Sequence, residues 1–194
     1  VTDVNTIQKQ EKLSEFKSDF LKTNIESWKE KWDSDYGGDL AQQKFVSPSK
    51  YLFLLNYGRV YNDEKVLSHV KNTLDIIAFS GLNDFIEGGF YRYTVDNEWK
   101  IPHFEKMLYD QAQMISLFSM AYKVYGDQTY RDVVDKTTTF LNLKMSASNG
   151  LYYAAMDADS DGEEGKYYSY TKDELEVISE NTDFSVFKSY YNIN

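Results

Sequence analysis

The chain has 194 residues and a formal net charge of −10, because 31 Asp and Glu residues outnumber 21 Lys and Arg residues. This length is enough for one domain with a substantial core, and two prolines and ten glycines are too few for a linker-rich assembly. The acidic balance, without a basic cluster, argues against nucleic acid and anionic membranes as partners and favours a neutral or cationic small ligand. The absence of cysteine excludes disulfides, thiolate zinc sites and cysteine nucleophiles.

The two ends of the chain predict a fragment. It begins at Val1 without an initiator Met, an apolar signal-like segment or a run of about 18 apolar residues. The last stretch, 184–194, is typical of the opening of a further element. We therefore expect residues 1–194 to be a single domain cut from a longer, cytoplasmic protein.

Apolar side chains recur at three- and four-residue spacing along most of the chain, which predicts helices. The expected helices span residues 6–32, 63–81, 104–125 and 127–141, and two more begin at 48 and 171. Ser47-Pro48 is typical of a helix start and Gly126 of a C-cap. Thr171 and Glu174 form a capping box, which contributes about 1 kcal/mol.

The remaining pattern decides the fold class. Residues 151–156 and 166–170 predict two short strands around an acidic turn. His69 borders the apolar stripe of the third helix, and a lone helical histidine is more typical of a surface or edge position than of a metal ligand. Helices alternating with elaborated loops favour an all-α array of hairpins, a solenoid or toroid with short β-hairpins in its loops, over a four-helix bundle.

Reactive side chains concentrate in residues 87–110. On an ideal helix beginning at His103, a rotation of about 100° per residue places four polar residues on one strip beside the apolar stripe. They are His103, Lys106, Asp110 and Gln113. Glu105 points the other way unless winding starts later. The stretch is either an ordinary helix N-terminus, where the dipole favours acids, or one wall of a pocket, and we favour the pocket.

A second cluster, residues 157–165, carries carboxylates at alternate positions. Its D-x-D-x-D-G spacing matches the start of a calcium-binding EF-hand loop, but Tyr168 stands where a bidentate glutamate is required. Three interpretations stay open: a solvated acidic turn, a calcium-stabilised loop, or a source of catalytic carboxylates such as Asp157 and Asp159.

Other cofactor and metal motifs are absent from the sequence. His103-Phe104-Glu105 matches the H-x-E of zinc deaminases without the P-C-x-x-C partner, and there is no P-loop, G-x-G-x-x-G or G-x-S-x-G. We expect no cofactor and no metal. Most aromatic residues lie in core stripes, and those in loops where they could meet a ligand are Tyr91, Tyr93, Trp99, Tyr152 and Tyr153.

Several motifs together resemble one family. They are residues 88–96, Trp99, 102–113 and 157–166, with Tyr36-Gly37-Gly38 and Lys44-Phe45 as a further pair. They closely resemble the thioredoxin-domain-containing family that includes spermatogenesis-associated protein 20 and its bacterial homologues. Residues 39–43 depart from the family's usual Phe-Gly and proline.

The resemblance implies an upstream thioredoxin-like domain followed by an (α/α)6 toroid similar to N-acylglucosamine 2-epimerases and six-hairpin glycosidases. This chain would then be the first half of the toroid, without the downstream helices. A half toroid exposes apolar edges, so self-association is expected besides contact with the thioredoxin-like domain.

The resulting hypothesis is a carbohydrate-active domain with its pocket at residues 88–110 and 157–165. Epimerisation needs a base and an acid on opposite faces of the sugar carbon, for which His103 is the candidate, whereas glycoside hydrolysis needs two carboxylates. The candidate carboxylates are Glu105, Asp110, Asp157 and Asp159, and the candidate ligand contacts are Tyr91, Arg92, Trp99, Lys106, Gln113 and Glu164. The alternative is a non-catalytic binding or scaffold domain that serves the thioredoxin-like part.

Overall fold

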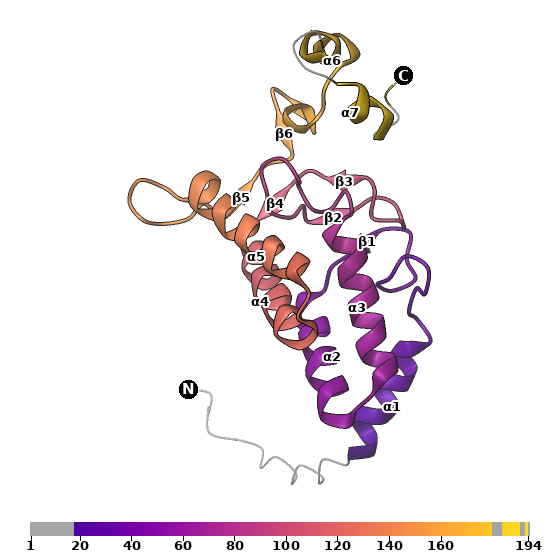
Figure 1. Ribbon diagram of the computed structural model, residues 1–194. Helices are drawn as coiled ribbons and strands as arrows, with labels where there is room; N and C mark the ends of the chain where they lie inside the picture. The colour runs from indigo at the N-terminus through magenta and orange to yellow at the C-terminus, as the bar shows by residue number, and fades with distance from the viewer. Residues whose placement is uncertain (1–17, 180–183, 191–192, 194) are drawn as a thin grey trace, which may run out of the picture.

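Helices form most of the structure, a computed structural model that describes residues 18–179, 184–190 and 193 (Figure 1). The α-helices are α1 (Ser18–Lys29), α2 (Pro48–Tyr61), α3 (Glu64–Ala78), α4 (Leu108–Tyr125), α5 (Gln128–Phe140), α6 (Lys172–Ser179) and α7 (Ser185–Tyr190). A π-helical turn, Leu141–Met145, extends α5, and a 3₁₀ turn covers Lys166–Tyr168. Residues before 18 in the first expected helix lie outside the described part of the chain. Within that part, no helix is long and apolar enough to cross a membrane.

Two tight connections make α2–α3 and α4–α5 antiparallel hairpins. Asn62 in the left-handed conformation ends α2, and the Asp63 side chain caps α3 by accepting from the Val66 amide. Gly126, at φ 70°, ends α4, as the sequence predicted, and its amide donates to the Tyr122 carbonyl. The hairpins then pack against each other mainly through α2 and α4, with a smaller contact between α3 and α5.

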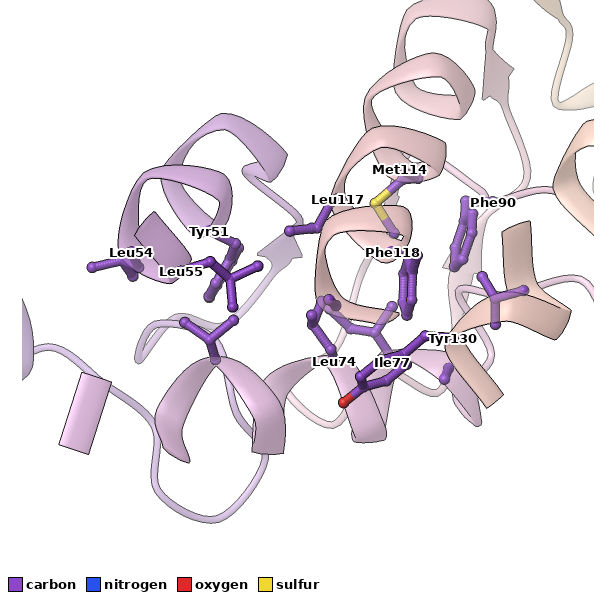
Figure 2. Close-up of a cluster of buried hydrophobic side chains, with 14 of the residues drawn as sticks. Tyr51, Leu54, Leu55, Leu74, Ile77, Phe90, Met114, Leu117, Phe118 and Tyr130 are labelled. Atoms are coloured by element: carbon purple, nitrogen blue, oxygen red, sulfur yellow. The ribbon is translucent and has the colours of Figure 1, made fainter. Parts of the chain in front are cut away.

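The core lies where these helices meet (Figure 2). Figure 2 shows the core side chains close together; they come from α2, α3, α4, α5 and the loop before α4, and those labelled are Tyr51, Leu54, Leu55, Leu74, Ile77, Phe90, Met114, Leu117, Phe118 and Tyr130. All are at most 2% exposed. A Phe or Leu buried in this way contributes roughly 1.5–3 kcal/mol, so these contacts hold the two hairpins together.

The strands are short and lie in the loops. They are β1 (Lys44–Phe45), β2 (Tyr93–Thr94), β3 (Pro102–His103), β4 (Lys106–Met107), β5 (Ala155–Met156), β6 (Asp159–Ser160) and β7 (Glu163–Glu164). They pair antiparallel as β1–β2–β3, β4–β5 and β6–β7.

Two sequence predictions about these loops are wrong. The helix expected from residue 104 begins at Leu108, because β3 and β4 use the preceding residues for sheet pairing. The helical strip built on His103 and Lys106 therefore does not exist. The strand expected at 166–170 is also missing, since 166–168 form the 3₁₀ turn and β5 pairs with β4 instead.

The loops before α2 and α4 contain the same arrangement, which we call the lysine-locked turn. In the first, the Asp33 amide donates to the Gly38 carbonyl, and buried Lys44 donates from Nζ to Asp33 Oδ2 and the Gly37 carbonyl, both at 2.6 Å. The Asp33 Oδ1 atom accepts from the amides at 35 and 36. One ammonium thus closes a turn made from an aspartate and a glycine pair.

The second lysine-locked turn repeats these bonds. The Asp84 amide donates to the Gly89 carbonyl, and Lys106 Nζ donates to Asp84 Oδ2 at 2.6 Å and to the Gly88 carbonyl at 2.9 Å. Asp84 Oδ1 again accepts from two following amides. Burial alone would raise the pKa of Asp84, but the Lys106 charge and the amide donors outweigh it and hold that pKa below its ordinary value.

His69 differs from its sequence expectation. It is only 9% exposed, and its ring stacks on Trp32 with centroids 3.9 Å apart. Burial lowers the pKa of His69 to about 4, so the ring is neutral in the folded chain. It belongs to the packing between the first loop and α3.

Candidate functional site

The sheet β1–β2–β3 lines up three rings at the loop end of the helices. Its register places Phe45 opposite Tyr93 and Tyr93 opposite His103. Cross-strand neighbours share one face of a sheet. The ring centroids are accordingly 4.5 Å apart for Phe45 and Tyr93 and 4.9 Å apart for Tyr93 and His103. The result is an aromatic row that ends in an imidazole, and Phe45 at its other end is 53% exposed.

The acidic loop reaches this row. Glu164, on β7, places Oε1 2.5 Å from His103 Nδ1. The two regions chosen from the sequence, 88–110 and 157–165, therefore meet at one imidazole. Carboxylate contact at Nδ1 orients the ring and decides which nitrogen carries the proton.

A second carboxylate lies near the other ring nitrogen. Glu105 Oε2 is 4.0 Å from His103 Nε2, which is beyond hydrogen-bond distance. The same oxygen accepts from Arg92 Nη1 at 3.0 Å, and the Arg92 amide donates to the Glu105 carbonyl. Arg92 thus holds Glu105 in place, and Nε2 has no strong partner there.

Asp110 lies in the first turn of α4, in a narrow cavity. The cavity is lined by Val46, Pro48, Leu82, Phe90, Tyr91, Arg92, Asp110 and Met114. The Asp110 Oδ2 atom is buried without a hydrogen-bond partner. Burial raises the pKa of Asp110 to about 6, opposed by the Arg92 charge and assisted by Glu105. The carboxyl group can therefore carry or release a proton near neutral pH.

Three of the expected ligand contacts are buried within the fold. Lys106 is 0% exposed and belongs to the second lysine-locked turn, with its ammonium 4.8 Å from the Tyr91 ring centroid. Tyr91 donates from its hydroxyl to Asp84 Oδ2. Trp99 is 1% exposed and donates from Nε1 to the Tyr36 carbonyl. These three side chains are buried and bonded within the fold, so they are not available to bind a ligand.

The other expected residues are exposed, and one of them, Asp159, is the cross-strand partner of Glu164. Asp157 and Asp159 are exposed, and Asp157 Oδ1 accepts from the Asp159 amide. Gln113 is exposed further along α4. Across the described parts of the chain, no three His, Asp or Glu side chains gather as a metal site.

Sequence reasoning missed two features. The contact between His103 and Glu164 joins residues 61 positions apart, so no local sequence pattern indicates it. The lysine-locked turn, by contrast, has a sequence pattern: Asp33 and Asp84 each stand four residues before a glycine pair, and a lysine follows further along the chain, on β1 and on β4. That repeat would have assigned Lys106 to the fold.

Solved structures with a similar arrangement of helices include a sugar epimerase and a glycoside hydrolase. A sugar epimerase from a ruminal bacterium superposes with a TM-score of 0.61 at 21% identity, over 71% of this chain and 41% of that one. A family 76 glycoside hydrolase from a bovine Bacteroides thetaiotaomicron strain gives a TM-score of 0.57 at 17% identity, over 74% of this chain and 33% of that one. The chain therefore has the helical-hairpin fold of part of an (α/α)6 toroid, which confirms the predicted fold class.

The sequence relatives are more specific. Spermatogenesis-associated protein 20 of Mus musculus is 37% identical over 159 residues, which cover 77% of this chain and 20% of the relative. The chain is a homologue of spermatogenesis-associated protein 20, as its motifs predicted, and spans about a fifth of the length of that relative. No family model matches the chain.

Proposed function

We propose that this chain forms one side of a carbohydrate-converting pocket in which His103 transfers protons. The observation that carries the proposal is the position of His103, at the end of the aromatic row and between two carboxylates. An exposed aromatic face suits the apolar C–H face of a sugar ring, and an imidazole beside it can take a proton from the sugar. The fold shared with a sugar epimerase and a glycoside hydrolase supports this choice by analogy alone.

Epimerisation next to a carbonyl is the reaction that these groups suit best. His103 Nε2 would accept the proton of the substrate carbon as general base. Asp110 lines a separate narrow cavity that does not include His103, so this step assigns it no contact with the sugar. In this proposal the chain is the first half of the toroid. The acid on the opposite face of the sugar carbon then comes from toroid helices outside this chain.

Proton exchange tests the proposal directly. A base that removes the C2 proton of a reducing sugar also exchanges it with solvent, so the chain in D₂O should introduce deuterium at C2 of glucose, mannose or cellobiose, as NMR would detect. His103→Ala should abolish the exchange and Phe45→Ala should weaken it. Asn97→Ala, an exposed loop change, is the control. Exchange that survives in His103→Ala would exclude the assigned base.

A second candidate function, a non-catalytic binding or scaffold domain, is favoured by a different observation. Lys106, Trp99 and Tyr91 are conspicuous in the sequence, yet they are buried and bonded within the fold. If the motif at residues 88–110 serves mainly to hold the loops in place, the chain would bind no sugar. Absence of any NMR shift with millimolar glucose, mannose and cellobiose would support this candidate.

A further inference from the structure

The loop that carries Glu164 is held firmly beside His103. Two residues with positive φ, Asp161 at 51° and Gly162 at 81°, make the turn between β6 and β7. At its base the Gly165 amide donates to the carbonyl of buried Ala158 at 2.8 Å. The backbone of this hairpin, and with it the start of the Glu164 side chain, therefore has a defined position.

Packing next to the histidine fixes the same hairpin. Phe104, which follows His103, stacks on Tyr168 with centroids 5.4 Å apart. Its ring lies so close to Gly165 that a Cβ atom there would be 2.5 Å away. Gly165 and Phe104, the residues that follow Glu164 and His103, are thus packed against each other. This packing brings the Glu164 carboxylate to Nδ1 of His103.

We infer that Glu164 is a positioning residue for His103: its carboxylate accepts a hydrogen bond from Nδ1–H and leaves Nε2 as the proton acceptor of the site. A carboxylate accepts hydrogen bonds and cannot donate one, so a contact of 2.5 Å requires the proton on Nδ1. Glu105 stands 4.0 Å from Nε2 and is bound to Arg92, so Nε2 stays available.

The catalytic meaning of this pair rests on the proposed function. When Nε2 takes the proton of the substrate carbon, the electron pair of that C–H bond moves to the neighbouring carbonyl and forms an enolate, while the Nδ1 proton stays in place. The proton on Nε2 can then exchange with solvent or return to carbon. The imidazolium then lies between the carboxylates of Glu164 and Glu105, which stabilise its charge. Glu164 thus acts through the histidine and is not a substrate contact.

The tautomer of His103 is the measurement that tests the inference. The chain has two histidines, so long-range ¹H–¹⁵N spectra of the histidine-labelled 194-residue chain contain two ring systems. His69 is the internal reference, since burial lowers its pKa to about 4 and keeps it neutral at pH 8. We expect His103 to show the Nδ1–H form, and Glu164→Ala to lower the ratio of Nδ1–H to Nε2–H about tenfold, the effect of losing one hydrogen bond to a charged group.

The control is Glu163→Ala, which removes the exposed carboxylate next along β7 and should leave the ratio unchanged. Unchanged His69 signals show that each variant is folded. An equal ratio in wild type and Glu164→Ala overturns the inference, whatever the chain does with sugars. A shifted ratio in a chain that exchanges no sugar proton upholds the Glu164–His103 pair and overturns the proposed function.

Discussion

Lys106 and Asp84 are joined by a 2.6 Å bond from Nζ to Oδ2, with side chains that are 0% and 6% exposed. The ammonium also bonds the Gly88 carbonyl and lies 4.4 Å from the Phe140 ring centroid. Residues from the loop before α4 and from the end of α5 are thus organised around one buried charge. The same bonds around Lys44 organise the loop before α2.

Removing the Lys106 charge should strongly destabilise the fold. Lys106→Met leaves the Asp84 carboxylate buried without its counter-ion, which typically costs about 3–5 kcal/mol. Urea denaturation measures the change. Lys100→Met, which removes an exposed lysine, is the control and should leave the midpoint almost unchanged. A double variant with Asp84→Asn should lose less than the sum of the single changes, and strict additivity would contradict the pairing.

Gly89→Ala should be far more harmful than Gly150→Ala. Both glycines have positive φ, 78° and 80°, so both substitutions carry the conformational cost of about 1 kcal/mol. A Cβ atom on Gly89 would also lie 2.6 Å from Phe140 Cδ1, whereas nothing lies within 4 Å of one on Gly150. We expect a total of about 3 kcal/mol for Gly89→Ala, from overpacking against a buried ring. Equal melting temperatures for the two variants would refute the close approach.

Asp110→Asn should change the pH dependence of stability. Because burial raises the pKa of Asp110 to about 6, the folded state binds the carboxyl proton more tightly than the unfolded state does. The contribution of Asp110 to the free energy of unfolding therefore falls as the pH rises from about 4 through 6. The variant should match wild type near pH 4 and exceed its unfolding free energy by on the order of 1 kcal/mol at pH 8. Chemical denaturation at several pH values measures this difference. Asp157→Asn, which changes an exposed carboxylate, is the control. A difference in unfolding free energy between Asp110→Asn and wild type that narrows with rising pH would contradict the raised pKa of Asp110.

Calcium should leave the thermal stability unchanged. A ligand that binds the folded state raises the melting temperature by mass action. In the acidic loop, however, Asp161 is turned to solvent with 82% of its side chain exposed, and Asp157 is bonded to the Asp159 amide. Melting curves with millimolar calcium and with chelator should coincide. A melting temperature that rises with calcium in wild type but not in Asp159→Asn would support the calcium-stabilised loop instead.

Local sequence patterns predicted the structure correctly where the hydrogen bonds involved lie within one helix or its ends. Gly126 ends α4 because its hydrogen bond lies within a few residues. The capping box also forms, with Thr171 Oγ1 accepting from the Glu174 amide and the Glu174 carboxylate accepting from the Thr171 amide. The all-α class followed from the spacing of apolar residues, which needs no knowledge of partners.

Tertiary structure decided the site. Residues 102–107 carry no pattern that separates a helix from an extended segment, and pairing with β2 and β5 selected the strands. Burial of Lys106 depends on Asp84 and on the end of α5, and His103 obtains its partner from Glu164. The sequence by itself determined the helices, their caps and the segments that carry the chemistry. Only long-range packing determined which charged groups became structural and which stayed open to a ligand, because desolvation and pairing depend on neighbours distant along the chain.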